Sequence, residues 1–184
     1  YVVTEVKKSV RRRNPAPPFT TSTLQQQASS RLGFQARRTM SVAQELYEGI
    51  EVKDMGAVGL ITYMRTDSLR LSDEATTDAR EYIGKTYGKE YVPKKVKEYK
   101  GKKDSQDAHE AIRPTMPSLS PAEIQDDLSP DQFRLYKLIW ERFMACQMES
   151  ALLDAVSARI NVNDYVFNAS GYTVKFDGYT RVFG

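Results

Sequence analysis

The spacing of apolar residues changes twice along this chain of 184 residues, and the change limits the folds that it can adopt. Residues 1–8 alternate and are mostly β-branched, and from Val156 to Val162 every second residue is apolar, as in β-strands. Most of the chain between these segments has helical spacing. The sequence therefore predicts an α+β fold, in which a mainly helical domain is inserted into a β-rich domain formed by the two ends of the chain.

Residues 14–18 are expected to mark the first edge of the helical region. They include three prolines, which fix φ and lack an N–H donor, so they predict an extended connector. At the other end, Asn163-Asp164 is expected to turn the chain back into residues 165–167, and the β pattern resumes over residues 172–176.

Capping residues and helix breakers divide the middle of the chain into shorter elements. We expect a first helix over 20–32, capped by Ser22 with Gln25 or Thr23 with Gln26 and stopped by Gly33, and a second helix that Thr39 or Ser41 opens and Gly49 ends. A strand or extended segment should follow over 58–63, then a helix from Ser72 to near Gly84 and a long polar loop over 87–103. Two more helices should start at Ser120-Pro121 and at Pro130, the second running to about Met148.

Composition excludes several classes of protein. The single cysteine, Cys146, excludes a disulfide or a cysteine-based zinc cage within the chain. No apolar stretch approaches the roughly 20 residues that cross a bilayer, and the first residues do not resemble a signal peptide, so we expect no membrane contact and a cytoplasmic protein. The net charge of +3 is mild, but basic residues cluster at 7–13, 37–38 and 94–103, either as solvated faces or as contacts to a polyanion.

Residues 62–68 concentrate chemically useful groups. In an extended segment Tyr63, Arg65 and Asp67 would point to one side and Thr62, Met64 and Thr66 to the other. A tyrosine phenolate can attack phosphorus when a cation stabilises it, and the planar guanidinium of Arg65 matches two phosphate oxygens. The alternative is a half-buried tyrosine of a strand beside an exposed arginine.

Residues 104–114 hold the only histidine, His109, which is the one side chain whose ordinary pKa lies near neutrality. On a helical turn His109 and Arg113 would share a face and form a cradle for an anion. A structural histidine is the alternative. No cluster of metal ligands and no glycine-rich phosphate loop accompanies these residues, so the sequence does not support a metal site, ATP or NAD.

Three blocks of the sequence resemble bacterial DNA topoisomerase I, a type IA topoisomerase. They are residues 17–26 (PPFTTSTLQQ), 59–68 (GLITYMRTDS) and 108–115 (AHEAIRPT), and they occur in the order found in that family. Met64 and the HEAIRP sequence favour the topoisomerase I branch over the topoisomerase III and reverse gyrase branches.

The resemblance implies a role for each candidate residue. Tyr63 would attack one DNA strand and keep its 5′-phosphate as a phosphotyrosine, Arg65 would neutralise the scissile phosphate, and His109 would contact the phosphate backbone. Further DNA or phosphate contacts would come from four residues: Arg113, Thr62, Thr66 and Asp67. The reaction would relax negatively supercoiled DNA without ATP.

The same resemblance implies that this chain is a central fragment of the enzyme. Residues 1–22 and 151–184 would be two parts of a β-rich hinge domain, and residues 23–150 the gate domain that carries the tyrosine. Magnesium would be bound by a toprim domain outside the chain, and without that domain the fragment would be inactive. DNA and the other domains are the expected partners, in the bacterial cytoplasm at the nucleoid.

Two alternatives of a different kind remain at this stage. The chain could bind single-stranded DNA through its basic clusters and tyrosines without chemistry. It could also belong to a tyrosine recombinase or type IB enzyme, which use more Arg and His residues and a 3′-phosphotyrosine; the single histidine and the three sequence blocks argue against this.

Overall fold

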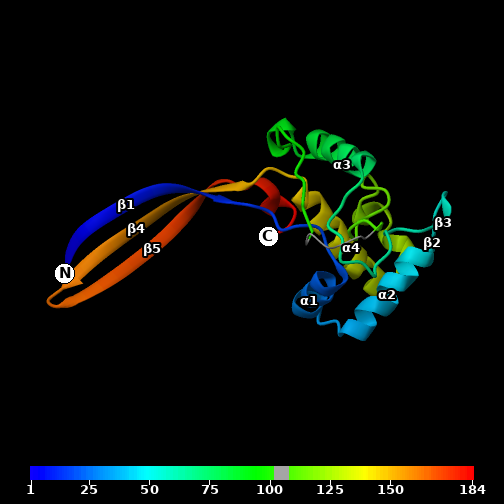
Figure 1. Cartoon of the computed structure of the whole chain (residues 1–184), viewed down its shortest axis with the longest axis horizontal. Helices are drawn as coiled ribbons and strands as arrows, with labels where there is room; N and C mark the ends of the chain where they lie inside the picture. Colours follow the sequence, from blue (N-terminus) through cyan, green and yellow to red (C-terminus); the bar gives the residue numbers. More distant parts are fainter. Residues whose placement is uncertain (102–107) are drawn as a thin grey trace.

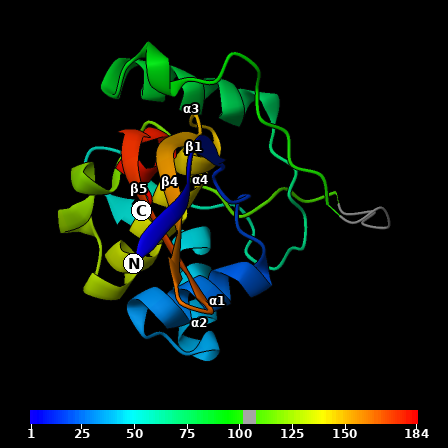
Figure 2. The ribbon, with the colours of Figure 1, turned by 90° about the vertical axis from the view of Figure 1, so that its left-hand side faces the viewer.

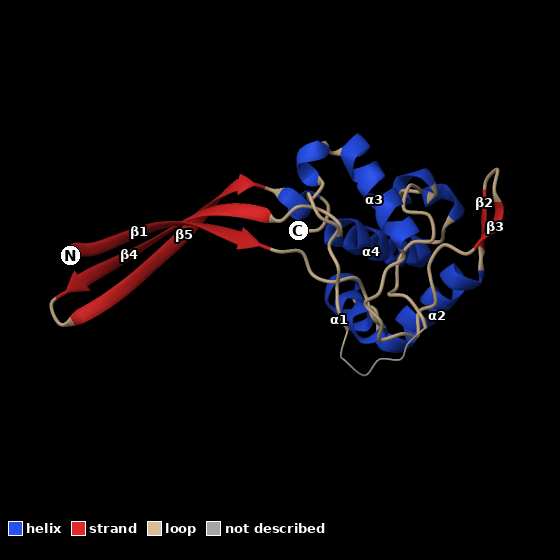
Figure 3. Cartoon of the chain, turned by 45° about the horizontal axis from the view of Figure 1, so that its top comes forward, coloured by secondary structure: helices blue, strands red, loops and turns tan. Residues whose placement is uncertain are grey.

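The computed structural model describes residues 1–101 and 108–184, in which a long β ribbon extends from one side of a helical body (Figures 1 and 3). The ribbon has three antiparallel strands in the order β1 (Val2–Arg13), β4 (Ala151–Val162) and β5 (Tyr165–Phe176). The central strand β4 therefore pairs with both ends of the chain. This arrangement confirms the predicted α+β class.

The ribbon strands follow the predicted alternation but extend further than predicted. The β4–β5 hairpin turns at Asn163, whose φ of 52° lies in the left-handed region that asparagine tolerates. Strand β1 does not end at residue 8; it continues to Arg13, which pairs with Ala151. The first basic cluster is thus part of an edge strand, where charged side chains discourage pairing with foreign strands.

The helical body is built around α4 (Pro130–Cys146), with α1 (Thr21–Leu32) and α2 (Ala36–Glu48) on one side and α3 (Asp73–Thr86) on the other (Figures 1 and 2). Helix α4 buries Leu135, Ile139 and Phe143 in the main apolar core. A small hairpin of β2 (Ile50–Val52) and β3 (Gly56–Val58) follows α2, and 3-10 turns lie at Lys89–Tyr91, Pro121–Glu123, Gln125–Asp127 and Gly178–Arg181.

Two of the predicted helix starts are confirmed. Ser129 and Gln132 form a reciprocal capping box at the start of α4, and the Ser72 hydroxyl accepts a hydrogen bond from the N–H of Ala75 at the start of α3. Helix α3 ends two residues beyond the predicted Gly84, at Thr86, and α4 ends at Cys146 rather than near Met148.

Three other predicted starts are wrong in detail. The box of α1 joins Thr20 to Thr23, because Thr20 is the last extended residue before the helix. Helix α2 begins at Ala36 without a side-chain cap; the predicted cap Thr39 lies inside the helix, where its hydroxyl donates to the carbonyl of Gln35. Ser120 does form a capping box, but it starts only one 3-10 turn, because Ile124 leaves the helical conformation.

The connector and the loop near the ribbon agree with the sequence. Residues 14–18 have no regular structure, and residues 87–101 form a loop with one 3-10 turn. The domain boundaries at residues 22 and 150 stay a prediction. Within the described part of the chain, no helix is both long and apolar enough to cross a bilayer.

Candidate active site

Three segments that are distant in the sequence meet at the centre of the site. Residues 111–115 lie between Phe19 and residues 60–62, with isolated antiparallel bridges from Phe19 to Ile112 and from Ile61 to Pro114. The N–H of Ile112 donates to the carbonyl of Phe19 at 2.8 Å, and the N–H of Thr62 donates to the carbonyl of Arg113 at 2.9 Å. The three blocks singled out in the sequence are therefore held together by main-chain hydrogen bonds.

The predicted alternation of residues 62–68 is present. Met64, Thr66 and Ser68 are buried, whereas Arg65 and Asp67 are exposed and Tyr63 is half-buried. Residues 62–68 are extended but form no regular strand, since β3 ends at Val58 and the nearest bridge is made by Ile61, one residue before them. The buried side chains anchor the segment and leave the others available at the surface.

Tyr63 is flanked by two aromatic rings. The centroid of its ring lies 5.1 Å from that of His109 and 5.5 Å from that of Tyr47, which meets it edge to face. These contacts restrict the ring without enclosing it in the core. Tyr63 is therefore half-buried, next to the only imidazole of the chain.

Arg65 and His109 line the same open cavity, of ≈ 460 Å³. The remaining wall comes from Asp67, Thr66 and the start of α1, which contributes Thr20, Thr21, Ser22 and Gln25. Tyr63 is not in this wall, but its ring contacts that of His109, which is. A guanidinium, an imidazole and several hydroxyl groups thus line one cavity, and the imidazole joins that cavity to the ring of Tyr63.

Thr62 and Thr66 are engaged by the backbone. The Thr62 hydroxyl donates to the carbonyl of Ala111 at 2.7 Å and accepts from the N–H of Arg113 at 3.0 Å, and so joins two of the three segments. The Thr66 hydroxyl accepts from the N–H of Ser68 at 3.0 Å. A direct contact of either threonine to DNA stays a prediction.

The helical turn predicted for His109 and Arg113 is wrong. The segment is extended because residues 111–115 hydrogen-bond to chain on both sides. The Arg113 guanidinium is buried, donating from Nε to Glu110 Oε1 at 3.1 Å and from Nη2 to Glu110 Oε2 at 2.7 Å. It also donates to the Ser72 hydroxyl at 3.4 Å. The pair therefore ties the segment of His109 to the start of α3.

Glu110 is held as a carboxylate. Its partial burial disfavours the charge, but hydrogen bonds from Arg113 and the N–H of Ser72, with the charges of Arg113 and Arg70, outweigh burial, and its pKa is lowered. Of the stretch 104–114 singled out in the sequence, residues 104–107 lie outside the described residues, as do Lys102 and Lys103 of the third basic cluster.

The described residues do not bring three metal-binding side chains together. Asp67 is the one carboxylate among the described residues that line the cavity. A magnesium site elsewhere in a longer protein stays a prediction.

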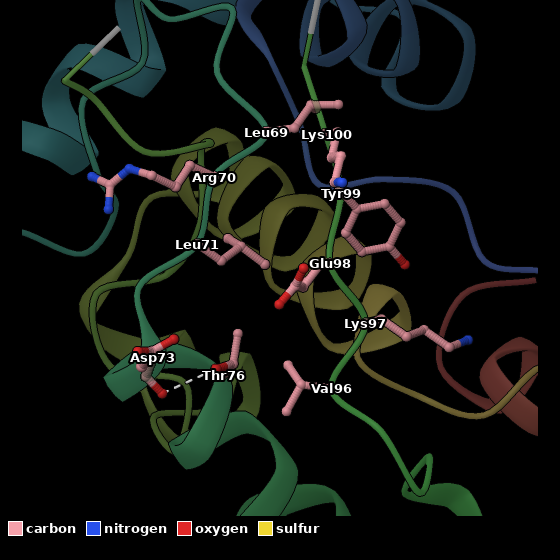
Figure 4. Close-up of a pocket in the computed structure, with 10 residues that line it drawn as sticks. All are labelled: Leu69, Arg70, Leu71, Asp73, Thr76, Val96, Lys97, Glu98, Tyr99 and Lys100. Carbon is pink, nitrogen blue, oxygen red and sulfur yellow. Dashed lines mark hydrogen bonds between the residues drawn. The ribbon is translucent and has the colours of Figure 1, made fainter.

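A second cavity, of ≈ 350 Å³, is drawn in Figure 4. It lies between residues 69–76 and the loop at residues 96–100, and the Thr76 hydroxyl donates to the carbonyl of Asp73 at its edge. Its wall includes none of Tyr63, Arg65 and His109, so it is separate from the candidate active site.

A family model described as DNA topoisomerase matches residues 1–184 of the chain. The chain belongs to this DNA topoisomerase family. It is also similar to the full-length topoisomerase I of Thermotoga maritima, with 44% identity over 99% of this chain and a TM-score of 0.86. The match covers 29% of the Thermotoga chain, so this chain spans less than a third of that topoisomerase.

Several residues of the candidate site could not be picked out from the sequence. Thr21, Ser22 and Gln25 fell within a quoted block but were considered only as the start of a helix, and Glu110 was not singled out within its block. Tyr47 gave no signal, because its contact to Tyr63 depends on how α2 packs against residues 59–63.

Proposed function

We propose that this chain is the part of a type IA DNA topoisomerase, of the topoisomerase I branch, that carries the active-site tyrosine. The observation that carries the proposal is the place of Tyr63, half-exposed and in ring contact with His109, beside a cavity lined by Arg65, in a chain of the DNA topoisomerase family. The 44% identity to a bacterial topoisomerase I supports the choice of branch.

The proposed reaction exchanges one phosphate ester for another. The Tyr63 oxygen attacks the phosphorus of a DNA phosphodiester and loses its proton, while the bond from phosphorus to O3′ breaks and O3′ takes up a proton. The products are a 5′-phosphotyrosine and a free 3′-hydroxyl, which can reverse the reaction. Because a phosphotyrosine ester replaces the phosphodiester bond, the energy of that bond is conserved and religation needs no ATP. Relaxation of negative supercoils gives the cycle its direction.

The neighbouring side chains fit separate tasks in this reaction. The exposed guanidinium of Arg65 would pair with the scissile phosphate and stabilise the charge of the transition state. His109 would donate to the phosphate backbone. Asp67 and Thr66 line the cavity and are the candidates for further contacts, whereas Arg113 and Thr62 would act by holding the segments in place.

The rest of the enzyme would supply what this chain does not bring together. We place the magnesium ion in the toprim domain of the full protein and expect the 184-residue chain alone to cleave poorly. Single-stranded oligonucleotide is incubated with magnesium and the chain, with and without the toprim part. Efficient cleavage by the chain alone would contradict this division of labour.

Strand passage would use the two connections between the ribbon and the helical body. At this junction the Ser150 hydroxyl lies 2.7 Å from Asn14 Oδ1, so the two connections contact each other. Cross-linking each connection in the full protein should leave cleavage intact and block relaxation. Normal relaxation by the cross-linked protein would refute a hinge at this place.

The proposal is tested by Tyr63→Phe in the full-length protein. This variant keeps the ring that contacts His109 and removes the attacking oxygen, so it should form no covalent DNA adduct and relax no plasmid. Tyr47→Phe is the matched control, because it removes a hydroxyl from the adjacent ring and should still form the adduct. Adduct formation by Tyr63→Phe would assign the nucleophile to another residue.

A non-catalytic role in binding single-stranded DNA is the second candidate. It is favoured by the cations of edge strand β1, where Arg11, Arg12 and Arg13 are exposed. In that case wild-type full-length protein would bind oligonucleotide and leave it uncut.

A further inference from the structure

We propose that Thr21, the first residue of α1, is a positioning residue whose hydroxyl fixes the backbone on both sides of Arg65. The inference rests on the proposed function and adds a group that acts through Arg65 rather than on DNA. It concerns a threonine that sequence analysis considered only as part of a helix start.

Thr21 makes four hydrogen-bond contacts to residues 64–66. Its hydroxyl lies 2.7 Å from the carbonyl of Met64 and 3.1 Å from that of Thr66, and accepts from the N–H of Thr66 at 2.9 Å. Its own N–H donates to the carbonyl of Thr66 at 2.9 Å. Three of the four contacts therefore depend on one hydroxyl group.

These contacts bracket Arg65. Met64 precedes the arginine and Thr66 follows it, and both are buried, so the hydroxyl bonds fix the backbone on each side of the exposed guanidinium. Tyr63 directly precedes Met64, the first of these two residues. A displacement of about 1 Å in a reacting group can slow a reaction about a hundredfold, so small shifts of this segment would matter.

Thr21 also connects the site to the ribbon. It lies three residues after the end of the connector (residues 14–18), which is held to the helical body where Arg142 Nε donates to the carbonyl of Pro17 at 2.6 Å. Phe19, two residues before Thr21, accepts from the N–H of Ile112. The Thr21 hydroxyl thus connects the chain that follows the connector to residues 64–66.

Helix capping does not account for this hydroxyl. The capping box of α1 is made by Thr20 and Thr23, and the Thr21 side chain contacts residues 64–66 instead. Thr23 is therefore a matched control, since Thr23→Val removes a hydroxyl from the same turn and breaks only the cap. Thr23 itself does not line the cavity.

The test uses Thr21→Val, Thr21→Ser and Thr23→Val in the full-length protein. We measure the single-turnover rate of oligonucleotide cleavage, the affinity for the same oligonucleotide, and the melting temperature. Thr21→Val should cleave about 10- to 100-fold more slowly with less than a threefold change in affinity. Thr21→Ser keeps the hydroxyl and should recover most of the rate, and Thr23→Val should melt earlier but cleave at the normal rate.

A double-mutant cycle identifies the route of the effect. In an Arg65→Ala background, Thr21→Val should slow cleavage much less than in wild type, because the group it positions is gone. Equal effects in the two backgrounds, a normal rate for Thr21→Val, or an equally slow Thr21→Ser would overturn the inference.

Misfolding of Thr21→Val and failure of the proposed function can each be distinguished from failure of the inference. If Thr21→Val fails to fold, Thr21→Ala compared with Thr21→Ser measures the same loss of hydroxyl, and equal rates for these two variants would overturn the inference. If Tyr63→Phe still forms the adduct, the proposed function fails, whatever the Thr21 variants show.

Discussion

The ion pair of Glu110 and Arg113 provides a test of how the segment of His109 is held. Glu110→Gln removes the charge that faces the Arg113 guanidinium and keeps one acceptor oxygen. Breaking a fully buried pair costs about 3–5 kcal/mol. Here the two side chains keep 18% and 11% of their exposure, and the amide oxygen can still accept one bond, so we expect a loss of about 2 kcal/mol of unfolding free energy.

The assay is thermal or urea unfolding of the chain. A loss of 2 kcal/mol corresponds to a fall of roughly 4–8 °C in Tm for a chain of this length. Glu81→Gln is the control: it breaks an exposed pair with Lys85 on α3 and should not change Tm measurably.

The stability that the charge of Glu110 contributes should depend on pH. Because the pKa of Glu110 is lowered in the folded state, its stabilisation is complete above the ordinary value of 4.5 and is lost as the pH falls through the folded value. The difference between wild type and Glu110→Gln should therefore narrow below pH 4.5. Equal stability of the two proteins near neutrality, or a difference that persists unchanged in acid, would refute the reasoning.

Three further predictions follow from local structure. Gly178→Ala should destabilise the chain by about 1–3 kcal/mol, because φ is +51° and the new Cβ would lie 2.6 Å from the carbonyl oxygen of Glu149; Gly171→Ala, with open space around it, is the control in the same unfolding assay. Ser129→Ala should cost about 1 kcal/mol in that assay, since it removes the cap of α4, and no loss would show that the cap is dispensable. His109→Ala in the full-length protein should slow single-turnover cleavage about 10- to 100-fold, and an unchanged rate would exclude His109 from the reaction.

The architecture was largely predictable because its signals are local. Alternation of apolar residues predicted both ribbon regions, the prolines predicted the connector, and Ser129 with Pro130 predicted the start of α4. Errors occurred where tertiary contacts decide the outcome. Strand β1 continues through its arginines because β4 offers pairing partners there, which residues 1–13 alone do not reveal.

The candidate site shows the same division. Alternation over residues 62–68 correctly predicted that Arg65 and Asp67 point away from buried Met64. Helical spacing gave the wrong geometry for Arg113, since the segment is extended between two others and the nearby Glu110 takes the guanidinium. The hydrogen bonds from the Thr21 hydroxyl to residues 64–66 could not be predicted from local pattern, because they join residues that are far apart in the sequence.

The most direct test of the account is to locate the DNA on the protein. Full-length protein is trapped with a single-stranded oligonucleotide and digested with trypsin, and the DNA-linked peptide is sequenced by mass spectrometry. The account predicts attachment through a 5′-phosphate to the peptide of residues 54–65, in which Tyr63 is the only tyrosine. Attachment to any other peptide, or through a 3′-phosphate, would contradict it.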